Sequence, residues 1–135
     1  MNSSDVGPFD LSETPIHLDF DIPAVPLRNF GFDGPSFEAY IDAHCGNDPG
    51  RIVMIEASPA DWKHWECHTL GDEIVIVLEG KANFIQELGG EQVVLSVQAG
   101  SAIINPRGVW HTADVSEPLK AIYITPAKGT EHRER

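Results

Sequence analysis

Four side chains that can bind a metal ion fall in two short segments of the sequence. Glu66, His68 and Glu73 lie in the first segment, and His111 lies in the second. Residues two apart on a strand project from the same face, so Glu66 and His68 would point the same way. A short turn after His68 would bring Glu73 back beside them on the next strand. If the strand that begins at His111 pairs beside the first segment, the four side chains form one site for a divalent metal ion.

A series of short strands must position these residues, and the sequence predicts them from residue 51 onward. Runs rich in β-branched and apolar residues alternate with turns that contain Gly or Pro. We expect strands over residues 51–57, 63–68, 73–78, 81–88, 91–97, 101–105, 109–115 and 119–125. Many short strands with such turns between them are typical of a sandwich or barrel, and not of alternating strands and helices. The sequence therefore predicts an all-β fold.

The N-terminal region differs in composition from the strand-rich part. Residues 1–27 contain five acidic residues, four prolines and no Lys or Arg, so they cannot close a core of their own. We expect a partly disordered arm whose first dozen residues are mobile, with a possible edge strand over residues 15–20. Residues 36–45 could form a helix or a strand. A single barrel domain would cover residues 28–127, followed by a polar C-terminal tail over residues 128–135.

Charge and cysteine content exclude several classes of partner. The chain has 9 Lys and Arg against 21 Asp and Glu, so no clustered basic surface can bind nucleic acid or an anionic membrane. The longest apolar run, residues 74–78, is too short to span a bilayer, and the N-terminus lacks the features of a secretory signal. Two cysteines, Cys45 and Cys67, are too few for a disulfide framework. We therefore expect a soluble protein of the reducing cytoplasm.

The two segments resemble the two motifs of the cupins, which are small double-stranded β-helix (jelly-roll) barrels. The first cupin motif is G-x5-H-x-H-x3,4-E-x6-G, and the second is G-x5-P-x-G-x2-H-x3-N. The positions that match are His68, Glu73 and Gly80 in the first motif, and Gly100, Pro106, Gly108 and His111 in the second. The resemblance implies a jelly-roll barrel with a flexible N-terminal arm. It also implies a metal site formed by Glu66, His68, Glu73 and His111.

Three positions depart from the cupin motifs. Ala60 replaces the first glycine of the first motif, Val115 replaces the final asparagine of the second, and Glu66 replaces the first metal-binding histidine. The Trp-Glu-x-His signature and the Thr-Glu-His-Arg ending at residues 130–133 resemble a subgroup of small bacterial single-domain cupins. That subgroup has no assigned reaction, so the resemblance implies a site but no substrate.

The replacement at Glu66 leaves two interpretations of the site open. As a ligand, Glu66 would give a neutral site of two histidines and two carboxylates, which suits Mn²⁺, Fe²⁺ or Ni²⁺ and also accepts Zn²⁺. Alternatively, His68, Glu73 and His111 bind the ion and Glu66 is an acid beside it. His64 shares the same strand face, so it could replace Glu66 as a ligand, act as a nearby base, or lie at the rim as an ordinary polar residue.

We expect a metal-dependent enzyme that acts on a small organic molecule, with Glu66 and His64 as the candidate catalytic residues. Oxygenation, decarboxylation, isomerisation and lyase chemistry all remain open. The alternative is a non-catalytic small-molecule-binding or sensor cupin with a structural metal. Cupins commonly dimerise, and the alternating apolar residues Ile16, Leu18 and Phe20 would suit the contact between two subunits of a homodimer.

Overall fold

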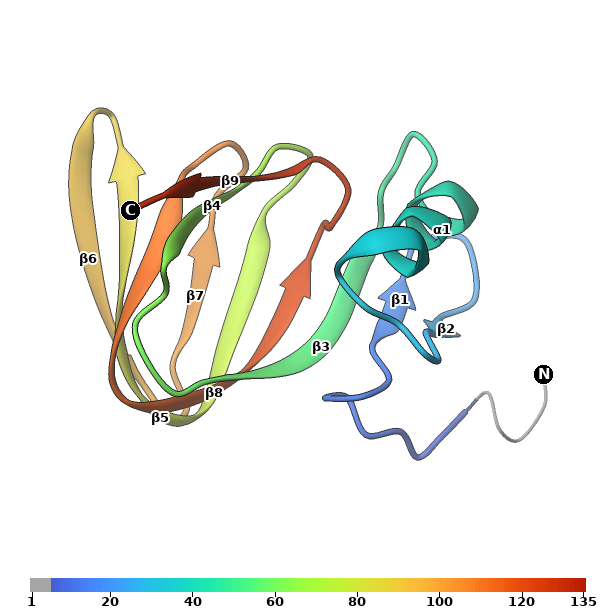
Figure 1. Cartoon of the computed structure of the whole chain (residues 1–135), viewed down its shortest axis with the longest axis horizontal. Coiled ribbons are helices and arrows are strands. Elements are labelled where there is room, and N and C mark those ends of the chain that lie inside the picture. Colours follow the sequence, from blue (N-terminus) through green and yellow to red (C-terminus); the bar gives the residue numbers. More distant parts are fainter. Residues whose placement is uncertain (1–5) are drawn as a thin grey trace.

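The chain forms a barrel of antiparallel strands with one helix at its end (Figure 1). The computed structural model describes residues 6–135, so part of the N-terminal stretch that we expected to be mobile lies outside the described residues. The elements in chain order are β1 (Ile16–Leu18), β2 (Val25–Pro26), α1 (Gly34–His44), β3 (Arg51–Ser58), β4 (His64–His68), β5 (Glu73–Leu88), β6 (Glu91–Gln98), β7 (Ala102–Asn105), β8 (His111–Thr125) and β9 (Thr130–Glu134). The predicted all-β class is confirmed.

Two long strands, β5 and β8, organise the barrel. Strand β5 pairs with β6, β7 and β8, and β8 also pairs with β3 and β4. Each long strand joins two of the short strands that we expected. In β5 the interruption lies at Gly80, which has a φ of 89° and packs so closely that an added Cβ would lie 2.0 Å from the carbonyl oxygen of Pro118. Only glycine fits this bend without a clash, so the strand turns there without ending.

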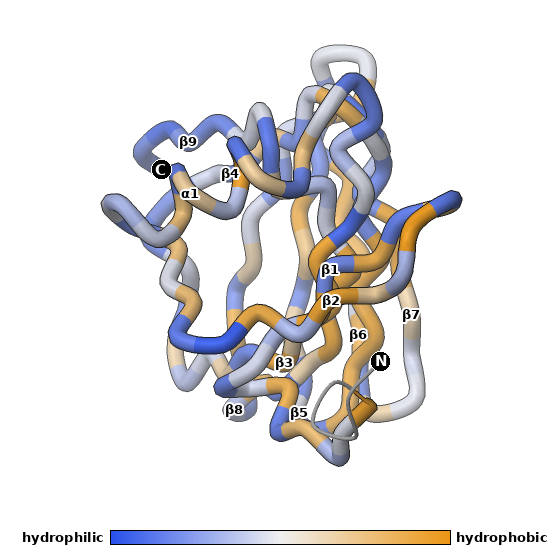
Figure 2. The backbone as a smooth tube through the Cα atoms, turned by 90° about the vertical axis from the view of Figure 1, so that its right-hand side faces the viewer, coloured by the Kyte–Doolittle hydropathy of each residue, from blue (hydrophilic) through white to orange (hydrophobic). Residues whose placement is uncertain are grey.

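The bend in β5 also keeps the apolar side chains on the inside. Before the bend, odd-numbered residues such as Val75 and Val77 are buried, and after it, even-numbered residues such as Ala82 and Phe84 are buried. The register with β8 shifts between Val77 and Ala82, and a one-residue shift exchanges the two faces of a strand. Figure 2 shows hydrophobic stretches along the barrel strands and hydrophilic ones near β9.

Residues 6–50 lie at one end of the barrel, on the right in Figure 1. We call them the N-terminal arm from here on; they extend beyond the arm of residues 1–27 that we expected, because α1 (Gly34–His44) also lies at this end. Strand β1 forms within the expected range, but it lies between β2 and β3, so β2 and not β1 is at the sheet edge. The helical alternative for residues 36–45 is confirmed by α1, which begins with a proline in its first turn. The helix attaches through Tyr40, whose hydroxyl lies 2.6 Å from Nδ1 of His17. Among the described residues, no helix is long and apolar enough to cross a bilayer.

The C-terminal segment is part of the sheet. Strand β9 pairs antiparallel with β4 over its full length, with Glu66 opposite His132. We expected a polar tail here because the segment has no apolar alternation, and its side chains are indeed mostly exposed. Backbone hydrogen bonds to the free edge of β4 hold it in place, and such bonds leave no signal in the residue types.

Candidate metal centre

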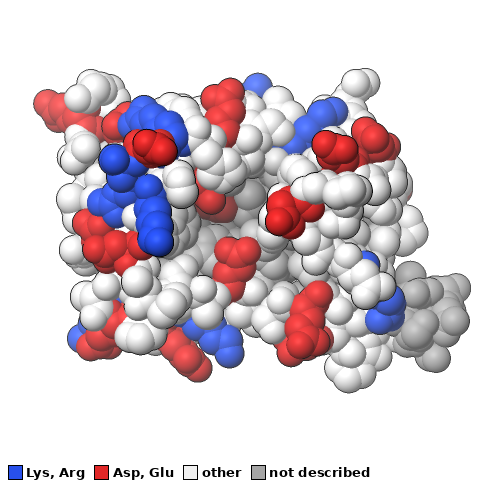
Figure 3. All heavy atoms as spheres, viewed as in Figure 1, with Lys and Arg blue, Asp and Glu red and all other residues white. Residues whose placement is uncertain are grey.

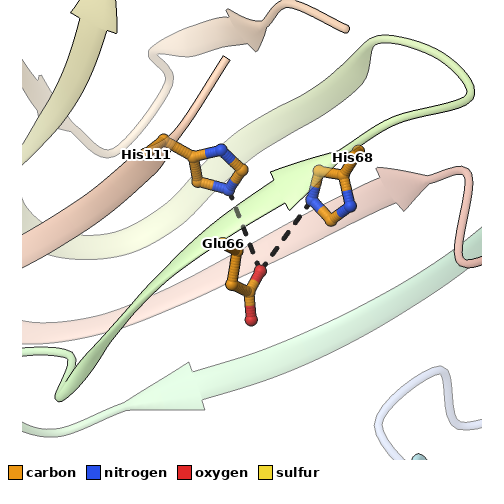
Figure 4. A group of neighbouring side chains, drawn as sticks. All are labelled: Glu66, His68 and His111. Carbon is orange, nitrogen blue, oxygen red and sulfur yellow. Dashed lines mark ion pairs between the residues drawn. The ribbon is translucent and has the colours of Figure 1, made fainter. Parts of the chain in front are cut away.

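Three of the four expected ligands meet on the inner face of β4 and β8. Glu66 and His68 are two residues apart on β4, and Glu66 lies directly opposite His111, the first residue of β8. Directly opposed residues on neighbouring strands have their side chains within reach of each other. The three side chains therefore converge, as Figure 4 shows.

The distances within this group suit a metal ion held between the side chains. The Oε2 atom of Glu66 lies 3.8 Å from Nε2 of His68 and 3.8 Å from Nε2 of His111. One ligand atom from each of the three residues lies within 4.8 Å of the others. The side chains of His68 and His111 are buried, whereas that of Glu66 is 30% exposed. Glu66 therefore faces the open side of the group.

The two imidazoles present Nε2 atoms that make no aligned hydrogen bond to any described residue, although carboxylate oxygens of Glu66 and Glu73 lie within 3.8 Å of them. Neither Nε2 atom accepts or donates a hydrogen bond within the described part of the chain, although both atoms are buried. Nδ1 of His68 lies 3.0 Å from the hydroxyl of Thr130, which orients the ring. Buried polar atoms are rarely left without a partner, and an orienting bond on the other ring nitrogen is typical of metal-binding histidines. The residues present therefore fit a divalent metal ion.

Glu73 lies behind the two histidines in a buried polar network. Its Oε2 atom is 3.2 Å from Nε2 of His68, and its Oε1 atom is 3.4 Å from Nε2 of His111. Oε1 also accepts a hydrogen bond from Asn105 at 2.9 Å, and Oε2 accepts one from Thr125 at 2.6 Å. Glu73 thus lies nearer to both histidines than Glu66 does, although it is not one of the three residues whose ligand atoms all lie within 4.8 Å of one another.

This network keeps Glu73 ionised. Burial by itself raises the pKa of the Glu73 carboxyl, but the close contacts with His111 and His68 outweigh it and hold the pKa well below its ordinary value. Gln86 extends the network, because its side-chain amide donates to the Oδ1 atom of Asn105 at 2.9 Å. A buried carboxylate with these donors is fixed in orientation and carries its negative charge beside the imidazoles.

Hydrogen bonds connect the turn that follows β4 to the turn that precedes β8. The amide of Gly108 donates to the carbonyl of His68, and the Nε of Arg107 donates to the carbonyl of Thr69 at 2.8 Å. The amide of Arg107 donates to Oδ1 of Asp72 at 2.7 Å. These bonds join the turn after β4 to the turn before β8, so the two sequence segments are held in register.

The group lies at one side of a cavity of about 570 Å³. Side chains from β3, β4, β8, β9 and the N-terminal arm line it, including the apolar residues Phe32, Phe37, Ile41, Met54, Trp62 and Tyr123. Glu56 on β3 also lines the cavity, although no motif or spacing in the sequence singles it out. Burial, and then the negative charges of Glu66 and Glu73, raise the pKa of its carboxyl. Within the described residues, the Glu56 side chain has no hydrogen bond or ion pair.

His132 is a second residue of the site that sequence reasoning missed. It lies on β9, and its Nε2 atom is 3.4 Å from Oε1 of Glu66, the oxygen that does not face the other two histidines. The Thr-Glu-His-Arg ending was the available signal, but nothing in the sequence showed that this segment pairs with β4. His64, in contrast, is exposed at the start of β4 and is absent from the described residues that line the cavity.

Comparisons with known proteins identify the fold and leave the function open. No family model matches the chain, and no curated protein matches it. Among solved structures, an uncharacterized protein with a double-stranded β-helix domain from Klebsiella pneumoniae is similar. The match has a TM-score of 0.52 and 23% identity, and it covers 63% of this chain and 76% of that one.

Two enzymes have a similar barrel. The Mn(II) oxalate decarboxylase of Bacillus subtilis matches with a TM-score of 0.53 and 18% identity over 62% of this chain. The Fe(II) form of HppE matches with a TM-score of 0.50 and 17% identity over 58% of this chain. The present chain covers only 23% of the first enzyme and 45% of the second. At these identities the matches establish the fold alone, which is the double-stranded β-helix that the two motifs predicted.

Proposed function

The chain has the double-stranded β-helix fold of the cupins, and we propose that it is a metal-dependent enzyme that acts on a small organic molecule bound in the cavity. The observation that carries this proposal is the pair of buried Nε2 atoms on His68 and His111, which lack a hydrogen-bond partner among the described residues and face the carboxylate of Glu66. A group of this kind beside a cavity lined by apolar side chains is the usual arrangement of a small-molecule metal site.

In this proposal Glu66, His68, Glu73 and His111 hold the ion. Two carboxylates and two neutral imidazoles balance the charge of a divalent cation, which suits Mn²⁺, Fe²⁺, Ni²⁺ or Zn²⁺. Similar barrels in other proteins hold Mn(II) and Fe(II). When bound, such an ion polarises an oxygen atom of the substrate or of a water molecule.

The protein's own residues orient and enclose the reacting molecule. Thr130 orients the His68 ring, and Asn105 and Thr125 fix the Glu73 carboxylate. Glu66 is the ligand that reaches the open cavity, so it is also our candidate for moving a proton to or from a bound molecule. His64, our other candidate from the sequence, is exposed and does not line the cavity, so we assign it no role in the reaction.

Metal content is the direct test of this proposal. The protein is purified without chelator or metal-affinity tag, and its Mn, Fe, Ni and Zn are measured beside those of a His68→Ala, His111→Ala double variant. We expect close to one ion per chain in the wild type and loss of that ion in the double variant. His64→Ala is the matched control and is expected to keep the ion. Absence of metal from the wild type, with no stabilisation by any added divalent ion, would refute the proposal.

Turnover separates the enzyme from its alternative, a sensor or binding module with a structural metal. The loaded protein is incubated with a library of small organic molecules, with and without oxygen, and the mixture is analysed by mass spectrometry. Conversion of a compound that also binds supports the enzyme. Tight binding with no conversion of any bound compound supports the binding module.

We further propose that the protein is a cytoplasmic homodimer. Cys45 and Cys67 are both free, as in proteins of a reducing compartment. Phe20 is 90% exposed, and Leu18, two residues before it in the chain, is 47% exposed. Apolar side chains that are exposed together often mark an interface. Light scattering after size-exclusion chromatography should show a dimer, and Phe20→Ser should weaken it; a monomeric wild type would contradict this part of the proposal.

A further inference from the structure

The cavity has two chemically different sides, and together they limit what can bind there. Acidic residues and side chains of the metal group (Glu66, His68, Glu73 and His111) form one part of the lining, and apolar side chains form the other part, which we call the apolar side. His68, His111 and Glu73 are buried, and Glu66, His68 and Glu73 line the cavity. A molecule that binds the ion from the cavity is therefore in contact with both the acidic and the apolar part of the lining.

The apolar side comes from two parts of the chain. Phe37 and Ile41 of α1, with Phe32 just before it, contribute from the N-terminal arm. Trp62 and Tyr123 contribute from the barrel, with ring centroids 6.4 Å apart. Aromatic and branched aliphatic surfaces of this kind favour a ligand with an aromatic or branched apolar body.

Tyr123 adds one polar group to the apolar side. Its side chain is buried, with 3% of the residue exposed, and its hydroxyl makes no aligned hydrogen bond within the described residues, although Ser58 lies beside it. Buried hydroxyls normally have a partner, so this atom is available to a bound molecule. The ligand is therefore expected to carry a polar atom as well as an apolar body.

The charges around the cavity are mostly negative. Glu56, Glu66 and Glu73 line it, and Lys128 is the one Lys or Arg among the described lining residues. The ammonium group of Lys128 is engaged elsewhere, because it donates to the carbonyl oxygens of Cys45 at 3.4 Å and Gly46 at 3.3 Å. Figure 3 shows acidic side chains around the hollow in the middle of this face, whereas Lys and Arg gather at the left.

A bound divalent ion would not reverse this balance. Its two charges are matched by Glu66 and Glu73, which leaves Glu56 on β3 and Lys128, two lining residues that form no ion pair with each other. A carboxylate or phosphonate bound at the ion would be repelled by Glu56, whereas Lys128 is held by the backbone carbonyls of Cys45 and Gly46. A neutral molecule avoids this repulsion, and the ammonium group of an amine can form an ion pair with Glu56.

We propose that the substrate of this site is a neutral or amine-bearing small molecule with an aromatic or branched apolar body and oxygen donors for the metal, and that the site discriminates against acids. This inference rests on the proposed function for the role of the metal. Glu56 sets the preference for charge, and Phe37 supplies part of the surface against which the apolar body packs.

Three probes that share one metal-binding head test the charge preference. Catechol is neutral, dopamine carries an ammonium group, and protocatechuate carries a carboxylate, and all three have the same dihydroxybenzene ring. Each is titrated calorimetrically, under nitrogen, into the protein loaded with whichever of Mn²⁺, Fe²⁺, Ni²⁺ or Zn²⁺ it binds best. We expect catechol and dopamine to bind at least about tenfold more tightly than protocatechuate. Protocatechuate binding as tightly as dopamine would overturn the inference.

Two variants assign the preference to its residues. Glu56→Gln removes the charge and keeps the shape, so it should reduce the advantage of dopamine over protocatechuate by about tenfold. Phe37→Ala should weaken all three probes by about the same factor, because it removes apolar contact and no charge. Val94→Ala, which changes an exposed apolar residue of β6 that does not line the cavity, is the control and should change none of them. An unchanged preference in Glu56→Gln would overturn the role of Glu56.

The same titrations separate this inference from the proposed function. If no divalent ion binds, the proposed function fails, and the probes are titrated into the metal-free protein. Glu56 and the apolar side are still present there, so the order of the three affinities still tests the inference. If an ion binds but protocatechuate is preferred, the metal site stands and the substrate class is wrong.

Discussion

The two ends of the cavity are built in different ways. At the metal end, the side chains stand on β4, β5 and β8. A long ladder of backbone hydrogen bonds joins β5 to β8, and β4 meets β8 at the pair Glu66–His111 and pairs with β9 along its whole length. At the other end, the arm meets the barrel through three residue pairs between β1 and β3 and through side chains such as Phe37. Backbone ladders fix positions closely, whereas side-chain packing can readjust. The barrel should therefore determine the positions of the metal ligands, and the arm should determine which small molecules fit the cavity.

The largest effect is expected at Glu73, which the buried network holds at the metal end. Glu73→Gln keeps the size of the side chain and removes its charge, so we expect the metal affinity to fall about 100-fold. Affinity is measured by competition with a chelator of known strength. Glu79→Gln, an exposed carboxylate on the same strand, is the control. Wild-type affinity in Glu73→Gln would show that Glu73 only supports the fold.

Gly80 tests whether the barrel depends on its internal bend. Gly80→Ala places a Cβ against the carbonyl oxygen of Pro118 in a backbone conformation that disfavours side chains. We expect a loss of about 2 kcal/mol or more in the free energy of unfolding, measured with urea.

Gly89 is the control for the bend. It also has a positive φ, but an added Cβ would have no neighbour within 4 Å. Gly89→Ala therefore measures the backbone strain without the clash. Equal losses in the two variants would mean that the close approach to Pro118 does not matter.

Tyr40 tests whether the arm can change without affecting the metal end. Tyr40→Phe removes the hydroxyl that lies 2.6 Å from Nδ1 of the buried His17. We expect a loss of about 1 kcal/mol in the free energy of unfolding, since one buried hydrogen bond is lost, with unchanged metal affinity. Weaker metal binding in this variant would contradict the separation between the two ends.

The smallest effect is expected at His132, which approaches the metal end from the C-terminal strand. Its imidazole contacts the Glu66 oxygen that does not face the other histidines, so His132→Ala should free that carboxylate to rotate. We expect the metal affinity to fall about fivefold. His64→Ala, a second exposed histidine on the neighbouring strand, should leave the affinity unchanged. An equal loss of metal affinity in both variants would mean that the effect comes from removing any nearby imidazole, and not from the specific contact between His132 and Glu66.

Local spacing together with the resemblance of the two motifs predicted which residues meet at the metal end. The positions of Glu66, His68 and His111 follow from alternation along a strand and from the spacing of the two motifs, and the structure brings these residues together. Strand positions in the barrel were also predictable, because apolar alternation and Gly or Pro turns are local features of the chain. The sequence did not predict that pairs of short strands join into the long strands β5 and β8. In β5 this depends on the bend at Gly80, which packs against Pro118, a residue far away in the sequence.

Only the tertiary structure determined how the remaining parts of the cavity come together. Glu56, His132 and Phe37 lie far from the motifs in sequence, and each reaches the cavity through a different contact: β3 with β8, β9 with β4, and α1 against the barrel end. A carboxylate on a strand, a histidine in a polar tail and a phenylalanine in a short helix have no periodic pattern that predicts a shared site. The sequence by itself thus determined the strands of the barrel, whose pattern is local, and the resemblance of its two motifs to those of the cupins indicated the candidate metal ligands. The charge and shape of the space in front of them depend on contacts between distant segments, which only folding creates.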